Sequence, residues 1–129
     1  MTGFRTPLGR ARGLGSAKRG VGHFIGQRVS AVALIFLMLW GVWSAFRLAG
    51  GGYAGAIIWL HSPVNAALLA LLSATVFYHM QLGVRTIIED YIHKPATKVT
   101  LLIANLFACY GGAALTVVCL LKIAIGGVS

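Results

Sequence analysis

Three long stretches of apolar residues run along the chain, and short polar or glycine-rich segments separate them. The stretches cover about residues 29–49, 63–90 and 98–125. At 1.5 Å of rise per helical residue, a stretch of roughly twenty residues spans about 30 Å, the thickness of the hydrocarbon layer of a bilayer. The pattern therefore predicts an all-α membrane protein with three transmembrane helices.

Helix-ending residues lie between these stretches. The glycines at residues 50–52 are expected to end the first helix, because glycine accepts the left-handed conformation that follows a helix. Residues 53–61 are expected to form a loop in which Trp59 lies at the membrane interface. Ser62 and Pro63 suit the N-cap and first turn of the second helix. That helix is expected to stop before Pro95, since the residue preceding a proline is disfavoured in helical geometry.

Composition and charge agree with a membrane protein and add an orientation. Of the 129 residues, 58% are hydrophobic and 10% are charged, with 11 Lys and Arg against two acids. A net charge of +9 can indicate nucleic-acid binding, but the position of the basic residues argues for a membrane flank instead. Those ahead of the first apolar stretch are Arg5, Arg10, Arg12, Lys18 and Arg19. Under the positive-inside rule this flank is cytoplasmic. Three spans then put the C-terminus on the opposite side. Because the flank accounts for the basic residues, no nucleic-acid partner is expected.

The chain divides into a tail and a single membrane domain. Residues 1–21 form a basic tail, expected to be flexible or bound to a partner, and residues 22–129 form the three-helix anchor domain. Residues 22–25 are mixed in character and suggest a short helix lying at the interface. The apolar run that follows is too long for a signal peptide and is read as a retained span.

Small residues predict where the helices pack closely. Ala66, Ala70 and Ala74 make a row along the second span, and residues 111–114 cluster on the third. Three helices alone cannot enclose a large cofactor. We therefore expect a partner subunit that contributes further helices to a larger bundle.

His79 lies in the middle of the second apolar stretch, where an ionisable side chain is energetically costly and usually functional. Asp90 follows eleven residues later, about 16 Å along a helix and within about 20° of the same face. One interpretation makes His79 an axial ligand of haem iron, since neutral imidazole is a standard donor. The other makes it a hydrogen-bonded histidine in a helix contact.

Asp90 and Tyr91 stand at the cytoplasmic mouth of the same helix. The tyrosine hydroxyl can donate a hydrogen bond to a quinone carbonyl, and the carboxylate can tune that hydroxyl or relay protons. Alternatively, Asp90 pairs with Arg85 or Lys94, and Tyr91 belongs to the interfacial aromatic belt.

Further candidates lie at the start of the first span. Arg28 has a guanidinium suited to a haem propionate or a quinone pocket, although it also fits ordinary snorkelling to the interface. The hydroxyl of Ser30 can support either site, and His23 is a weaker candidate for the same role. His61 and His93 are expected to be solvated in loops.

The order and spacing of these residues resemble a known family. The segments concerned are His79-Met80-Gln81-Leu82-Gly83-Val84-Arg85, Asp90-Tyr91 and Gly22-His23-Phe24-Ile25 with Arg28 and Ser30. From about residue 22 to 125 the chain resembles the smaller hydrophobic membrane-anchor subunit of succinate dehydrogenase, respiratory complex II. In better-known relatives the first histidine stands one residue further from the arginine, with an acid before the phenylalanine. Here His23 directly precedes Phe24, so the match does not extend to that position.

The resemblance implies roles for the candidate residues. His79 would ligate haem b shared with a partner anchor subunit, which would supply the opposite ligand. Tyr91 would hydrogen-bond ubiquinone with Asp90 beside it. Arg28 would lie near the haem propionates and the quinone pocket.

The resemblance also implies partners and a location. A larger anchor subunit of the cytochrome b556 type, an iron–sulfur subunit and a flavoprotein would complete an enzyme in which this chain is not catalytic alone. The expected location is the inner (cytoplasmic) membrane of a bacterium in preference to that of a mitochondrion. The expected function is to anchor the complex while electrons from succinate reduce quinone. The alternative is a haem-free structural anchor or proton-relay subunit of another membrane complex, including a fumarate reductase.

Overall fold

The computed structural model describes residues 6–8 and 18–126, and these residues are almost entirely helical. The helices are α2 (Lys18–Leu48), α3 (Gly52–Leu60), α4 (Pro63–Tyr91) and α5 (Pro95–Gly126). Helices α2, α4 and α5 are each long and apolar enough to cross a membrane. The prediction of an all-α protein with three membrane helices is confirmed. Most of the basic tail lies outside the described residues.

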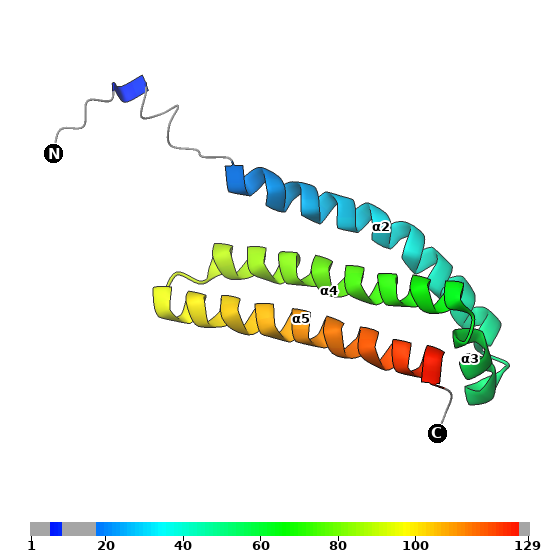
Figure 1. The fold of residues 1–129 in the computed structure, drawn as a ribbon. Coiled ribbons are helices and arrows are strands. Elements are labelled where there is room, and N and C mark those ends of the chain that lie inside the picture. Colours follow the sequence, from blue (N-terminus) through cyan, green and yellow to red (C-terminus); the bar gives the residue numbers. More distant parts are fainter. Residues whose placement is uncertain (1–5, 9–17, 127–129) are drawn as a thin grey trace.

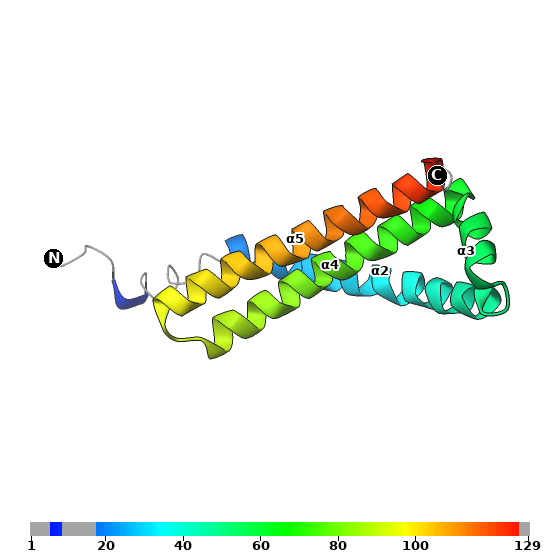
Figure 2. The same ribbon diagram turned by 90° about the horizontal axis from the view of Figure 1, so that it is seen from below.

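The three long helices form an open row with α4 in the middle (Figure 1). Helix α4 packs against both α2 and α5, whereas within the described residues no Cα atom of α2 lies within 8 Å of a Cα atom of α5. The start of α2 and the α4–α5 connection lie at one end, and α3 lies at the other end beside the end of α5 (Figures 1 and 2). The end of α4 that carries Asp90 and Tyr91 therefore lies at the same end as the start of α2.

Two expectations about short segments were wrong. Residues 22–25 do not form a separate interfacial helix, because α2 runs without a break from Lys18 to Leu48. Residues 53–61 are not a loop, because residues 52–60 form α3. This segment is strongly apolar, and its Trp59 stacks on Trp40 of α2 with ring centroids 5.7 Å apart. Packing against α2 thus stabilises residues 52–60 as a helix, where the sequence had predicted a loop.

The ends of the helices follow local rules. Gly52 has a φ of 57°, the left-handed conformation that glycine adopts without strain, at the turn between α2 and α3. Ser62 occupies the N-cap position of α4 with extended backbone, but its side chain makes no capping hydrogen bond. Pro63 occupies the first turn, where its missing N–H costs nothing.

Close contacts hold the row together in the absence of a sealed core. No described side chain is completely buried. Between α4 and α5, Asn105 Nδ2 donates to the Gln81 carbonyl at 3.0 Å, and Gly112 lies under the ring of Phe77. Between α2 and α4, Gly26 lies against Tyr78, since a Cβ on Gly26 would come within 2.7 Å of the tyrosine oxygen.

Candidate functional site

His79 and Ser30, which are 49 residues apart in the chain, meet between α4 and α2. The Ser30 Oγ lies 2.9 Å from His79 Nδ1, and the same hydroxyl donates to the Gln27 carbonyl at 3.0 Å. Ser30 is 5% exposed and His79 is half-buried. The structure therefore brings together two of the residues that the sequence singled out, by a direct contact.

The second ring nitrogen of His79 is in a different situation. Within the described part of the chain, Nε2 of His79 has no hydrogen-bond partner. It is also not one of the buried unpartnered atoms there, which are His23 Nε2 and Gln27 Oε1. Nε2 is thus not sealed inside this three-helix unit, and His79 as a whole is half-buried.

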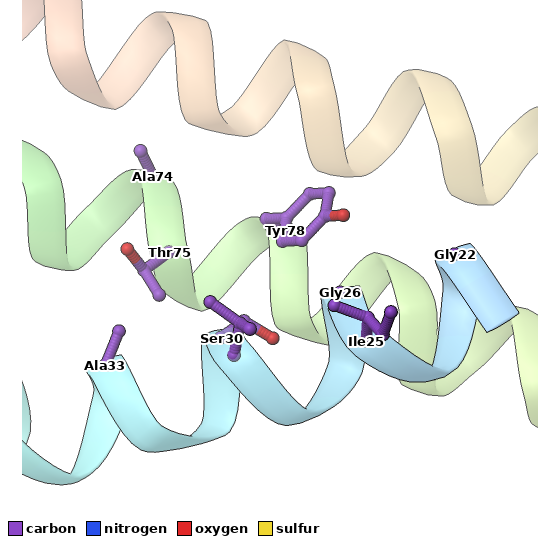
Figure 3. A pocket seen from close by; sticks show the side chains of 9 residues that line it. Gly22, Ile25, Gly26, Ser30, Ala33, Ala74, Thr75 and Tyr78 are labelled. Carbon is purple, nitrogen blue, oxygen red and sulfur yellow. The ribbon is translucent and has the colours of Figure 1, made fainter.

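A groove of about 570 Å³ opens between α2 and α4 next to this contact. Figure 3 shows Gly26 and Ser30 on α2 across from Thr75 and Tyr78 on α4. The groove exists because small residues line it: Gly22, Gly26, Ser30, Ala33 and Ala74. Its walls are mostly apolar, with the Ser30 hydroxyl as a polar point beside His79.

His23 lies two turns before Ser30, on the same side of α2. Its Nε2 and the Gln27 Oε1 one turn later are buried and have no hydrogen-bond partner among residues 6–8 and 18–126. A buried polar atom without a hydrogen bond costs roughly 1–3 kcal/mol. The first two turns of the α2–α4 contact therefore contain polar groups that are unsatisfied within this chain.

Arg28 is not brought to His79. It is exposed, and its guanidinium lies over the ring of Phe24 at 5.1 Å from the ring centroid. Two residues along a helix correspond to a rotation of about 200°, so Arg28 and Ser30 lie on nearly opposite faces of α2. Arg28 is nevertheless within one helical turn of the level of His79.

Asp90 and Tyr91 end α4 and are exposed, Tyr91 by 77%. The alternative in which Asp90 pairs with Arg85 is wrong in this structure, because Arg85 Nε binds Glu89 Oε1 at 2.8 Å. The i, i+4 spacing of that pair favours it over a partner five residues away. Among the described residues Asp90 has no salt bridge, so it remains available at the end of the helix.

His61 and His93 are exposed and lie near backbone carbonyls. His61 Nδ1 lies 3.3 Å from the Ala124 carbonyl, which links the C-cap of α3 to the end of α5. His93 Nδ1 lies 3.0 Å from the Tyr91 carbonyl in the α4–α5 connection. Both belong to the ends of the molecule, and His79 is the histidine at the middle of a membrane helix.

These residues offer one side chain, the His79 imidazole, that could bind a metal ion held by a cofactor. No three His, Cys, Asp or Glu side chains gather into a metal site within the described residues. One imidazole with a nitrogen that is not sealed could hold the iron of a haem, and a bound haem would supply one-electron redox chemistry. A quinone carbonyl would need a donor such as the Tyr91 hydroxyl.

The row of small residues on α2 was missed at the level of sequence. Gly22, Gly26 and Ser30 recur at intervals of four, the same small-xxx-small signal that the alanines of the second span carry. This spacing marks the face of α2 that contacts α4 and predicts that Ser30 faces inward.

Comparison with known proteins gives a family match over nearly the whole chain. The model of the succinate dehydrogenase/fumarate reductase transmembrane subunit family matches residues 2–121. The chain is 38% identical over 103 residues to the succinate dehydrogenase hydrophobic membrane anchor subunit of Rickettsia bellii (strain RML369-C), covering 78% of this chain and 81% of that protein.

Two further relatives have the same description. The protein of Rickettsia conorii (strain ATCC VR-613 / Malish 7) is 30% identical over 107 residues, which is 82% of this chain and 85% of the relative. That of Rickettsia typhi (strain ATCC VR-144 / Wilmington) is 29% identical over 107 residues, with the same two coverages. No solved structure matches the chain.

Proposed function

Because the chain belongs to the succinate dehydrogenase/fumarate reductase transmembrane subunit family, we propose that it is the hydrophobic membrane anchor of a succinate:quinone oxidoreductase. In this role it holds the complex in the bilayer and helps to bind haem b and ubiquinone. The observation that carries the haem assignment is His79, a mid-helix imidazole with one nitrogen hydrogen-bonded to Ser30 and the other not sealed inside the chain.

The haem is proposed to lie against the exposed side of His79, shared with a partner anchor subunit. This chain offers one imidazole at that depth, so a second ligand to the iron would have to come from the partner. A bound haem b supplies a one-electron redox centre in the low-dielectric interior. The residues of this chain orient the His79 imidazole. Arg28, within one helical turn of the level of His79, supplies a cation for a haem propionate or for the quinone pocket.

The quinone site is proposed at the end of α4. Tyr91 donates its hydroxyl hydrogen to a quinone carbonyl, and Asp90 supports that hydroxyl or takes part in proton transfer. The exposure of both residues and the absence of a salt bridge to Asp90 among the described residues support this role. His23 is proposed only as a minor contributor at the start of α2.

Under the positive-inside rule, the basic flank supports a cytoplasmic position for this end of the molecule and the opposite side for the C-terminus. An iron–sulfur subunit, with a flavoprotein bound to it, is proposed to dock at the cytoplasmic end. The bacterial relatives support the inner membrane of a bacterium as the location. The chain cleaves no bond itself. Its contribution is to shape the pocket and place the donors.

Purification of the complex through an affinity tag on this chain tests the proposal. We expect a flavoprotein and an iron–sulfur protein to co-purify, with a b-type haem in the reduced-minus-oxidised spectrum. Dithionite is the reductant and ferricyanide the oxidant, so the haem readout needs no turnover. A preparation with neither a b-type haem nor a flavoprotein would contradict the proposal.

One observation favours a second function. The hydrogen bond to Ser30 already gives His79 a partner, as a purely structural or proton-relaying histidine would have. A haem-free anchor or proton-relay subunit, including one of a fumarate reductase, is therefore the second candidate. The same spectrum separates the two, because the haem-free candidate predicts no b-type signal in a fully assembled complex.

A further inference from the structure

Three groups form a hydrogen-bonded chain between α2 and α4: the Gln27 carbonyl, the Ser30 hydroxyl and the His79 ring. The Ser30 Oγ is 3.0 Å from the Gln27 carbonyl oxygen and 2.9 Å from His79 Nδ1. Both distances are those of good hydrogen bonds. Ser30 is 5% exposed, so water does not readily replace either partner.

Counting hydrogens in this chain assigns the histidine tautomer. A serine hydroxyl has one hydrogen to donate, whereas a backbone carbonyl can only accept. Ser30 donates that hydrogen to Gln27, as serines in helices commonly do to a carbonyl of the preceding turn. The contact with His79 is then satisfied only if Nδ1 carries the ring hydrogen and donates it to Ser30. In that neutral tautomer Nε2 holds the free lone pair.

The free lone pair lies on the nitrogen that is not sealed inside the chain. Within the described residues, Nε2 of His79 has no hydrogen-bond partner and is not one of the buried unpartnered atoms. A nitrogen that binds iron must present a lone pair, and the hydrogen bond at the other nitrogen decides which one does so. The contact with Ser30 therefore prepares His79 for ligation before any haem is present.

We infer that Ser30 is a positioning residue that fixes the orientation and tautomer of His79 and raises the donor strength of Nε2 toward haem iron. This inference rests on the proposed function, in which His79 is the ligand. Ser30 itself touches no iron. It acts through the imidazole, in the way that acceptors behind metal-bound histidines do.

A set of variants in the purified complex tests this role. Ser30→Ala removes the acceptor. The pair Ser30→Thr and Ser30→Val adds the same extra branch at Cβ, but only threonine keeps the hydroxyl. Ser44→Ala is the control, because Ser44 is another buried serine of α2 at a different level. The readouts are haem content, the haem midpoint potential and the electron paramagnetic resonance signal of the oxidised haem.

We expect Ser30→Ala and Ser30→Val to retain haem roughly tenfold or more weakly than the wild type, the usual effect of removing such an acceptor. We also expect a more positive midpoint potential, because a less basic imidazole stabilises ferric iron less. Ser30→Thr should restore wild-type values, and Ser44→Ala should leave them unchanged. A residue that only fills space would not separate threonine from valine.

The experiment separates failure of the Ser30 role from failure of the haem assignment. If Ser30→Ala and Ser30→Val keep the wild-type potential and resonance signal while His79→Ala loses them, the role of Ser30 is overturned and the haem assignment stands. If His79→Ala also keeps them, the haem assignment itself is overturned. If the valine variant does not assemble, the comparison of alanine with threonine decides between the same outcomes.

Discussion

His79 and Asp90 lie on one face of α4, yet their surroundings differ in kind. His79 is half-buried in the contact with α2 and has a hydrogen-bond partner there. Asp90 stands exposed at the helix end, and among the described residues it has no salt bridge, since the nearby Arg85 is paired with Glu89. One face of the helix thus carries a half-buried imidazole at its middle and an exposed carboxylate at its end.

The proposed quinone role of Tyr91 is tested by removing its hydroxyl. Tyr91→Phe keeps the ring and loses one hydrogen-bond donor, whose net value of about 1–1.5 kcal/mol corresponds to a loss of roughly tenfold in quinone reduction. Oxidation of succinate with a soluble dye as acceptor should stay at the wild-type rate, because that electron path ends before the membrane.

Tyr53→Phe is the matched control for this experiment. Tyr53 is also an exposed tyrosine, but it lies in α3 at the opposite end of the molecule. Equal rates of quinone reduction in wild type, Tyr53→Phe and Tyr91→Phe would exclude a hydrogen bond from Tyr91 to the quinone.

The sequence could identify the candidate residues but not their contacts. His79 stood out because a histidine is costly at that depth. Its contact with Ser30 depends on how α2 is rotated against α4, which only the small-residue row on α2 hints at. The Arg85–Glu89 pair, in contrast, follows from i, i+4 spacing and was available from the sequence.

At the scale of the elements, glycines determine how closely the helices approach. A Cβ on Gly112 would lie 2.7 Å from Cε1 and 3.0 Å from Cζ of Phe77, so either the Phe77 ring or the spacing of α4 and α5 would have to change. The neighbouring Gly111 has nothing within 4 Å of the same position. Two adjacent glycines of one helix therefore have opposite expected responses to substitution.

Gly112→Ala is predicted to destabilise the α4–α5 contact by about 1–3 kcal/mol, the usual cost of overpacking. Gly111→Ala should have little effect or stabilise slightly, because alanine is the better helix former. Thermal unfolding of the purified complex measures both. Phe77→Leu should recover part of the loss in the Gly112→Ala background, and strict additivity of the two changes would contradict the contact.

Element types were more predictable than element ends. The three long apolar stretches became α2, α4 and α5, while α2 extended through the glycines of residues 20–26 and residues 52–60 formed α3. Glycine is common in membrane helices, so its usual meaning as a helix breaker is weak there. The stacking of Trp59 on Trp40 is a tertiary contact that no local pattern reveals.

The whole molecule is a row of helices with a large exposed apolar surface. Within the described residues the backbones of α2 and α5 do not approach each other, and no described side chain is completely buried. Lipid can cover such a surface, but it could not supply a second ligand to the proposed haem.

Expression of this chain without its proposed partner anchor is therefore predicted to give no six-coordinate b-type haem. Co-expression with the partner should give the haem signal and raise the amount of this chain in membranes. Absorption spectra and immunoblots of membrane fractions measure both effects. A six-coordinate haem in membranes that contain this chain alone would contradict a shared site.

The most direct measurement is the reduced-minus-oxidised spectrum of the assembled His79→Ala complex. His61→Ala and His93→Ala serve as controls, because both histidines lie at the ends of the molecule. We predict that His79→Ala loses or strongly alters the b-type signal, while both controls keep it and all three complexes contain their flavoprotein. A wild-type haem spectrum in a fully assembled His79→Ala complex would contradict the assignment of His79 as the haem ligand.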